Sequence, residues 1–317
     1  MGKADSRQQQ NARERIAAQQ ATARQAELRR RTLIAGAAIL AVIAVVVGLI
    51  IAKAASNGST AATGATSKSQ AAEVTNAAVA SELTSIPAST FNAVGAGPAS
   101  GANAVNPLVP VSGKPVLTSG GKPEMLYVGA EYCPFCGAER WAMATALSRF
   151  GTFSGLRFIH SSSTDVFSNT PTLTFYGSTY TSPYLVFVPV ETTTVSKAPL
   201  QNPTSAQLAL MNLYDAPPYV PSGDNGAFPF VDVGNRYITD GAQYLPSVLG
   251  SIEGPAPSHQ ALTWAQVAQD LRNPSSQVAQ AVLGAANHIT AAICKITNGQ
   301  PGSVCNSPAV QAVGSQI

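Results

Sequence analysis

The sequence predicts a mixed α/β domain that follows a membrane-spanning segment, and three observations support this prediction. Residues 33–52 form an apolar run without a charge. A short apolar run at residues 125–128 precedes two cysteines and a segment with helical apolar spacing. Strand-like and helix-like segments then alternate towards the C-terminus, which is the order typical of α/β domains. With 317 residues, of which 45% are hydrophobic, the chain is long enough to bury a sizeable core.

The basic charge of the chain is confined to its N-terminus. Residues 1–31 carry a net charge of +5, and the rest of the chain carries −2, so the overall charge of +3 describes neither part. A short basic tail on an otherwise mildly acidic protein does not favour nucleic-acid binding, and no nucleic-acid partner is expected. We interpret residues 1–31 as a cytoplasmic basic tail.

Residues 32–52 are expected to form one transmembrane helix. The apolar run LIAGAAILAVIAVVVGLIIA contains 20 residues, which at about 1.5 Å per residue matches a hydrocarbon core of roughly 30 Å. Arg29, Arg30 and Arg31 precede this run, whereas only Lys53 follows it closely. The positive-inside rule therefore predicts a single-pass protein of the cell membrane, with its N-terminus in the cytoplasm and its C-terminal domain outside.

A cleaved signal peptide is the alternative interpretation, because Ala52-Lys53-Ala54 fits a small-x-small cleavage site. The long basic leader and the apolar run both exceed the usual proportions of a signal peptide, which favours a retained anchor. Residues 53–71 contain Ala, Ser, Thr and Gly but no large apolar side chain, so they are predicted to be a flexible linker. Residues 72–317 then form the extracytoplasmic domain.

Local patterns predict the elements that surround the cysteines. Residues 74–94 are expected to form one or two short helices broken at Pro87. A buried strand at residues 125–128, a helix beginning near Pro134 and a second strand at residues 156–161 form a strand–helix–strand unit of the kind found in parallel sheets. Trp141, on this helix, is expected to lie in the core rather than to floor a substrate groove.

Further elements are predicted between this unit and the C-terminus. They are strands within residues 173–176 and 184–190, a helix at residues 204–214 capped by Thr204, an antiparallel hairpin at residues 228–238, and helices at residues 262–271 and 278–296.

Cys133 and Cys136 carry the predicted chemistry. Two cysteines three positions apart in the first turn of a helix can close a small disulfide and open it again. The Cys133 sulfur is expected at the helix N-terminus, where unpaired N–H groups and the helix dipole favour the thiolate and lower its pKa. Cys136, one turn further and more buried, is expected to resolve a mixed disulfide by attacking Cys133. Pro134 fits between them because the first helical turn does not need its missing N–H.

Zinc binding and an inert structural disulfide are the alternatives for this motif. A zinc site would require a second pair of cysteines or histidines, and Cys294 and Cys305 lie too far apart in the sequence to supply one. The spacing therefore favours redox chemistry, and no cofactor or metal is expected.

Three segments of the chain resemble a known family. They are EYCPFCGAERWAMATALSRFG, STDVFSNTPTLTFYGS and FPFVDVGNRY. Together they resemble the membrane-anchored, thioredoxin-like family catalogued as a domain of unknown function, DUF929, over residues 72–310. The resemblance implies a thioredoxin-like fold, here with an N-terminal single transmembrane helix and a C-terminal helical extension, while the activity of that family is unassigned.

The thioredoxin resemblance implies roles for residues outside the cysteine pair. Thioredoxin-like proteins carry a cis-proline that faces the active disulfide and offers backbone groups to the substrate chain. Pro229 matches this proline, so the Phe228-Pro229 bond is expected to be cis, with a trans proline at the start of a strand as the alternative. The residues expected to bind the substrate chain are Tyr132, Pro134, Phe135 and Phe228.

One position departs from the thioredoxin pattern. Many thioredoxin-like enzymes have a buried carboxylate six residues before the first cysteine, where this chain has Tyr127. A phenol with a pKa near 10 is a poor base at neutral pH. Glu131, two residues before Cys133, is the predicted catalytic substitute, and a solvated surface carboxylate is the alternative for it.

Cys294 and Cys305 are predicted to form a structural disulfide that pins the C-terminus to the fold. Closing a loop of about a dozen residues should stabilise the protein by on the order of 3 kcal/mol. A second redox pair that relays electrons to Cys133 and Cys136 is the alternative. An even number of cysteines suits a compartment that permits disulfides.

These features predict a membrane-anchored, extracytoplasmic thiol–disulfide oxidoreductase. Its expected partners are the thiols and disulfides of exported proteins, an unknown redox partner that recharges the site, and the membrane through residues 33–52. The alternative, from a different class, is a thioredoxin-fold binding or chaperone-like module of the envelope whose cysteines form a stable, non-catalytic bridge.

Overall fold

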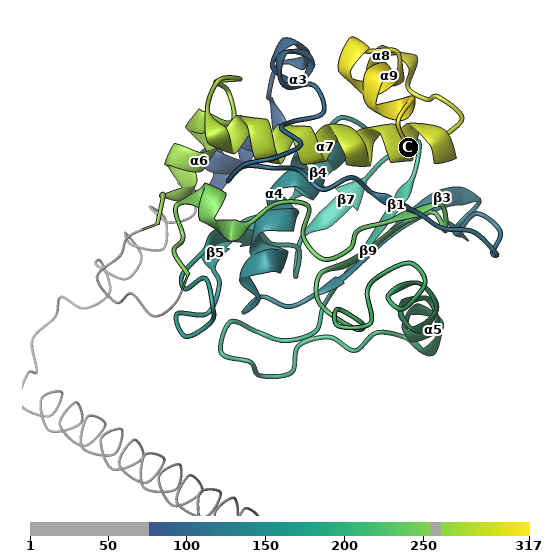
Figure 1. Cartoon of the computed structure of the whole chain (residues 1–317), viewed down its shortest axis with the longest axis horizontal. Helices are drawn as coiled ribbons and strands as arrows, with labels where there is room; N and C mark the ends of the chain where they lie inside the picture. Colours follow the sequence, from purple (N-terminus) through teal and green to yellow (C-terminus); the bar gives the residue numbers. More distant parts are fainter. Residues whose placement is uncertain (1–75, 254–260) are drawn as a thin grey trace, which may run out of the picture. The chain divides into compact units, whose positions relative to one another are not determined.

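The computed structural model describes residues 76–253 and 261–317 (Figure 1). The predicted basic tail, transmembrane helix and linker, residues 1–71, lie outside these described residues. Within the described part of the chain, no helix combines the length and apolar character needed to cross a membrane.

A six-stranded sheet forms the centre of the domain. Its strands are β1 (Val109–Pro110), β2 (Thr118–Ser119), β3 (Lys122–Gly129), β8 (Val186–Glu191), β9 (Phe230–Val233) and β10 (Tyr237–Ile238). Strand β3 lies between a parallel neighbour, β8, and an antiparallel neighbour, β9. The hairpin β9–β10 continues the sheet, and β1 pairs with β10 at its edge.

Strand β3 is buried on both faces because a layer of helices or loops covers each side of the sheet. Met125 and Tyr127 belong to the core cluster that includes helices α4 (Pro134–Leu147) and α7 (Gln277–Ile296). The alternating residues Leu126 and Val128 belong to a second cluster, which includes Tyr214 of α5 (Ser205–Tyr214). This follows from the two-residue period of a strand. It also explains why the sequence here is a continuous apolar run.

The helices lie in two groups about the sheet (Figure 1). Helix α7 packs along α4, and α3 (Ala88–Val94) and α9 (Pro308–Gly314) pack on α7. The shorter α6 (Trp264–Asp270), α8 (Gly302–Cys305) and the 3-10 helix η1 (Pro246–Leu249) complete this layer. Helix α5 lies apart from these helices, near β9. Residues 76–84 are also helical and precede α3.

Several predicted elements are confirmed. The N-terminal helical segment is interrupted at Pro87, which becomes the N-cap of α3. Thr204 caps α5 in a capping box with Gln207. The hairpin at residues 228–238 and the two helices on either side of Pro274 also form as expected. Local signals therefore predicted these elements well.

The predicted strand–helix–strand unit is wrong in its second strand. Strand β5 (Arg157–His160) pairs antiparallel with β6 (Pro171–Thr174) in a separate two-stranded sheet, and the parallel partner of β3 is β8. Strands β4 (Thr152–Ser154) and β7 (Thr179–Thr181) form another such pair. Of the four residues of β5 only Phe158 is buried and both end residues are exposed, which suits a hairpin with a solvated face better than a central parallel strand.

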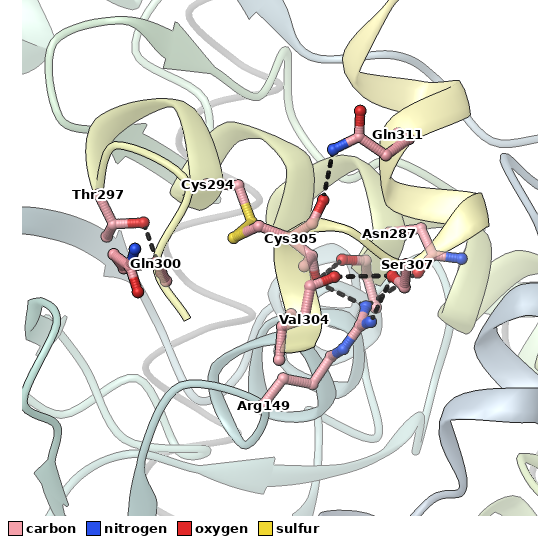
Figure 2. The surroundings of a disulfide bond; sticks show 11 residues. Arg149, Asn287, Cys294, Thr297, Gln300, Val304, Cys305, Ser307 and Gln311 are labelled. Carbon is pink, nitrogen blue, oxygen red and sulfur yellow. Dashed lines mark hydrogen bonds between the residues drawn. A yellow bond between two sulfur atoms is a disulfide. The ribbon is translucent and has the colours of Figure 1, made fainter. Parts of the chain in front are cut away.

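The C-terminal extension is fastened by a disulfide and by one arginine (Figure 2). Cys294 in the last turn of α7 and Cys305 in α8 are disulfide-bonded, with their Cα atoms 5.6 Å apart. Arg149, which follows α4, donates hydrogen bonds to Asn287 at 3.1 Å and to Ser307 at 3.3 Å. These contacts join the end of α4 to α7 and to the N-cap of α9. The sequence predicts a C-terminal helical extension, but it does not predict α8 and α9 as separate helices after residue 296.

Candidate active site at the first turn of α4

Cys133 is the N-cap residue of α4. Strand β3 ends at Gly129, and three residues connect it to Cys133, whose backbone is still extended at φ −74° and ψ 122°. Its sulfur accepts a hydrogen bond from the backbone N–H of Cys136 at 3.3 Å. Pro134 occupies the first helical position, where a missing N–H costs nothing. The local sequence alone therefore places one thiol at the positive end of the helix.

The two thiols lie in different environments. Both are unbonded cysteines, but Cys133 is 8% exposed and Cys136 is fully buried. The Cys136 thiol, which can donate a hydrogen bond to the Cys133 thiolate, lowers the pKa of Cys133, and the nearby Arg140 cation acts in the same direction. Burial raises the pKa of Cys136 well above its ordinary value. This asymmetry makes Cys133 the reactive thiol of the pair.

Phe228 and Pro229 face the cysteine pair. The Phe228–Pro229 peptide bond is cis, and the Phe228 carbonyl oxygen lies 3.9 Å from the Cys133 sulfur, close enough to accept its S–H. Pro229 directly precedes β9, the antiparallel neighbour of β3. The pairing of these strands therefore brings residues far apart in the sequence to the same thiol.

Aromatic side chains surround the motif. Tyr132, Phe135 and Phe228 are half-buried and pack around Cys133 and Cys136, whereas Pro134 is buried. The Phe135 ring meets that of Phe167 edge to face at 5.6 Å. The structure thus gathers all four predicted substrate-binding residues at the cysteine pair. Cys294 and Cys305 belong to the main core cluster rather than to the cluster around the motif.

Glu131 lies beside the motif but bonds elsewhere. Its carboxylate is largely buried and accepts a hydrogen bond from the Thr174 hydroxyl at 2.8 Å. It also lines a polar cavity of about 530 Å³ together with hydroxyl-bearing residues and Lys197. Its burial does not fit the alternative of a solvated surface carboxylate, and its hydrogen bond is to Thr174 rather than to a cysteine. A catalytic role for Glu131 stays a prediction.

A buried ion pair that the sequence does not predict lies next to the cysteines. Arg140 donates from Nε and Nη2 to the two carboxylate oxygens of Glu191, each at 2.8 Å, and both side chains are fully buried. Arg140 Nη2 also donates to the carbonyl oxygen of Ala130 at 2.6 Å. The Tyr127 hydroxyl donates to Glu191 at 3.5 Å.

A signal for Arg140 was present in the sequence, because a residue four positions after Cys136 shares its helix face. There was no comparable signal for Glu191. It enters the site only because β8 pairs with β3 and sets Glu191 opposite Gly129.

Gly129 leaves room for this arrangement. A Cβ atom on residue 129 would overlap the Tyr127 hydroxyl and lie 3.0 Å from the Cys136 sulfur. The hydroxyl and the sulfur therefore border the same small space, which a larger residue at this position would fill.

Two other buried carboxyl groups, those of Glu139 and Asp232, form no salt bridge among the described residues. Glu139 accepts a hydrogen bond from the Gln243 N–H at 2.9 Å, and Asp232 accepts one from the Asn235 N–H at 2.7 Å. The second carboxylate oxygen of each is buried without a hydrogen bond. Burial raises the pKa of Glu139 to about 7 and that of Asp232 to about 7. Both groups therefore favour the protonated form below about pH 7 in the folded protein.

We expect these two carboxyl groups to make the fold more stable in mild acid than at pH 8. Because their folded pKa values lie above the unfolded ones, their contribution is fully present below about pH 4 and is lost as the pH rises to about 7. The loss should be on the order of 3 kcal/mol for each group. Urea unfolding of the wild type and of the Glu139→Gln/Asp232→Asn variant, measured from pH 5 to pH 8, checks this. Parallel pH curves for the two proteins would contradict it.

No metal site accompanies these groups within residues 76–253 and 261–317. Among them, no group of three or more His, Cys, Asp or Glu side chains is arranged to hold a metal ion. The site contains two thiols of unequal acidity, the Phe228 carbonyl that faces them, and the buried ion pair of Arg140 and Glu191.

Fold and site together define a mixed α/β protein with a free cysteine pair at the N-terminus of a central helix. Residues 108–295 match the family described as "Domain of unknown function (DUF929)", and the chain belongs to this family. The matched region contains every residue of the site described above and ends just after Cys294. No curated protein and no solved structure shows a significant match to the chain.

Proposed function

We propose that this protein is a membrane-anchored thiol–disulfide oxidoreductase that acts on exported proteins outside the cytoplasm. The observation that carries the proposal is the difference between the two thiols. Cys133 lies at the helix N-terminus with a lowered pKa, whereas Cys136, one turn away, is fully buried with a raised pKa. Two-step disulfide exchange requires an attacking thiol that keeps some exposure and a resolving thiol that is protected.

In the reducing direction, the Cys133 thiolate attacks one sulfur of a substrate disulfide. A mixed disulfide forms, and the other substrate sulfur leaves as a thiolate that takes up a proton. The Cys136 thiolate then attacks the Cys133 sulfur, which releases the second substrate thiol and leaves a Cys133–Cys136 disulfide. In the oxidising direction the same steps run backwards, so that the protein's disulfide passes to a substrate dithiol.

The residues around Cys133 support a polypeptide as the substrate. The Phe228 carbonyl faces the reactive sulfur and is a hydrogen-bond acceptor suited to a backbone N–H of a bound chain. The half-buried rings of Tyr132 and Phe135 flank it with apolar surface. Such a site fits an extended, loosely folded segment around a substrate cysteine.

The strand order supports a thioredoxin-like fold for the domain. The strand before the cysteines has a parallel neighbour on one side and, on the other, an antiparallel hairpin preceded by Pro229. Helices α4 and α7 share one face of this sheet, and α8 and α9 form a C-terminal extension. This is the arrangement that the thioredoxin resemblance implies.

The cellular location is inferred from the sequence and from one structural feature. The charge-free run at residues 33–52, preceded by three arginines, supports a single membrane anchor with the domain outside the cytoplasm. The Cys294–Cys305 disulfide is consistent with an oxidising compartment. Thiols of exported proteins and a redox partner that recharges the site are then the expected partners.

The proposal is tested by the reduction potential of Cys133 and Cys136. The protein is equilibrated in graded thiol–disulfide buffers, and the fraction of alkylated cysteines is read by mass, with Cys294 and Cys305 as the internal reference. We expect a value between about −120 and −270 mV, where the upper end indicates a disulfide donor and the lower end a reductant. If the pair resists reduction as strongly as Cys294 and Cys305, the bridge is structural, and a binding or chaperone-like module replaces the enzyme.

A further inference from the structure

We infer that Tyr127, Glu191 and Arg140 form a relay that removes the proton of Cys136 and balances the charge of its thiolate. Glu191 is the terminal proton acceptor, the Tyr127 hydroxyl passes the proton on, and Arg140 is the counter-cation. This inference rests on the proposed exchange reaction and concerns its second step, in which Cys136 must act as a thiolate.

The need for such a relay follows from burial. Cys136 has no exposed surface, and burial raises its pKa well above the ordinary value, so it is a neutral thiol in the resting protein. A thiolate created there without compensation would be an isolated charge in a poorly polarisable interior, which is strongly unfavourable.

Two observations support a route for the proton. The Tyr127 hydroxyl shares the space beside Gly129 with the Cys136 sulfur and donates a hydrogen bond to Glu191 at 3.5 Å. In one concerted step the Cys136 proton moves to the Tyr127 oxygen while the Tyr127 proton moves to Glu191. Tyrosine is therefore neutral before and after, so its high pKa does not prevent it from passing the proton.

The transfer leaves the summed charge of Cys136, Tyr127, Glu191 and Arg140 at zero. Before it, the Arg140 cation faces the Glu191 carboxylate. After it, the Arg140 cation faces the Cys136 thiolate, and Glu191 is a neutral acid. Because no net charge is created or moved to solvent, the desolvation cost that opposes release of the proton to water does not arise.

One unused donor on Arg140 supports its role as counter-cation. Its Nε and Nη2 atoms bind Glu191 and Ala130, whereas its Nη1 atom is buried without a hydrogen-bond partner among the described residues. Unpaired buried donors of this kind are rare and call for an explanation. Arg140 lies one helical turn after Cys136, and its charge lowers the pKa of both cysteines. A thiolate at Cys136 would provide the missing negative partner.

The other nearby carboxyl groups are differently placed. The hydrogen bond of Glu131 goes to Thr174, and that of Glu139 goes to Gln243. Neither hydrogen bond connects to Tyr127 or to Arg140. Glu139 therefore serves as a control for Glu191, and Tyr244, a buried tyrosine whose hydroxyl donates to the Ala138 carbonyl, serves as a control for Tyr127.

The test separates the two steps of exchange in the full-length protein. The reduced protein is mixed with a dithiobis-nitrobenzoate reagent, which releases one coloured thiolate when Cys133 attacks and a second when Cys136 resolves the mixed disulfide. We expect a fast first phase in every variant that keeps both Cys133 and Arg140. The second phase should slow about tenfold in Tyr127→Phe and about 10²-fold in Glu191→Gln, and it should stay unchanged in Tyr244→Phe and Glu139→Gln.

Two further measurements exclude a merely structural effect. In Glu191→Gln the second phase should recover as the pH is raised, because a higher pH increases the fraction of Cys136 present as thiolate without the relay, whereas a distorted site would not recover. The double variant Arg140→Met/Glu191→Leu removes both charges together, which a fold tolerates better than the loss of one. It should slow both phases, because the cation assists both cysteines.

The outcomes distinguish this inference from the proposed function. A normal first phase with an unchanged second phase in Tyr127→Phe and Glu191→Gln overturns the relay and leaves the oxidoreductase proposal intact. Slowing of the second phase by Glu131→Gln but by neither of these variants overturns it in favour of Glu131. A wild-type first phase no faster than that of an ordinary surface cysteine overturns the proposed function itself, and the relay with it.

Discussion

Replacing Cys133 by Ser is expected to abolish thiol–disulfide exchange completely. A serine hydroxyl at this position is neutral at pH 7, because neither the helix N-terminus nor Arg140 lowers its pKa far enough to ionise it, so the attacking group is lost. Cys136 cannot substitute for it, since its sulfur is fully buried and its pKa is raised. The measurement is the reduction of a small protein disulfide by the variant, compared with the wild type.

Cys136→Ser is the matched variant and should have the opposite signature. The reactive thiol remains, so mixed disulfides form through Cys133, but no second thiol resolves them. Trapped complexes should accumulate in cells and disappear on gels run with a reducing agent. Equal exchange activity in wild type and Cys133→Ser, or an absence of trapped partners in Cys136→Ser, would argue for the non-catalytic module instead.

Trp141→Ala is expected to cause the largest loss of stability from a single side chain outside the site. Trp141 is fully buried in α4, packs against Phe158, and donates from its indole N–H to the Pro171 carbonyl at 2.9 Å. Its removal leaves a large cavity and an unpaired carbonyl, which together cost about 3 to 5 kcal/mol in free energy of unfolding. Urea unfolding followed by circular dichroism measures this loss.

Trp264 provides the control, because the chain contains only two tryptophans. Its indole N–H also donates to a backbone carbonyl at 2.9 Å, that of Ile159, but its ring is only half-buried. Trp264→Ala should therefore cost about 1 kcal/mol. Similar losses for the two variants would mean that burial of Trp141 does not dominate the packing of α4 on the β5–β6 pair.

The sequence was most informative where the structure depends on neighbouring residues. The pair Cys133 and Cys136 and the start of α4 follow from four consecutive residues, and Thr204 caps α5 through contacts within one turn. The apolar run of β3 and the turn of the β9–β10 hairpin are similarly local. These features depend on steric and hydrogen-bonding preferences of neighbouring residues, and such preferences can be recognised in a single sequence.

The sequence did not predict which strands pair with one another. The pattern of residues 157–160 predicted a strand correctly, but the choice between β3 and β6 as its partner depends on which faces become buried in the assembled domain. The short helices α8 and α9 were missed for a related reason. Their placement depends on the Cys294–Cys305 bond and on Arg149, which reaches across from the end of α4.

By itself, the sequence determined where the reactive cysteines lie and which of them caps the helix, because the three-residue spacing and Pro134 act within one helical turn. Only the tertiary structure decided what surrounds them. Arg140 and Glu191 are 51 residues apart in the chain, and they meet because β8 pairs in parallel with β3 after an inserted segment. A buried charge is stable only beside a partner of opposite charge, so the identity of that partner depends on the whole sheet and not on any local pattern.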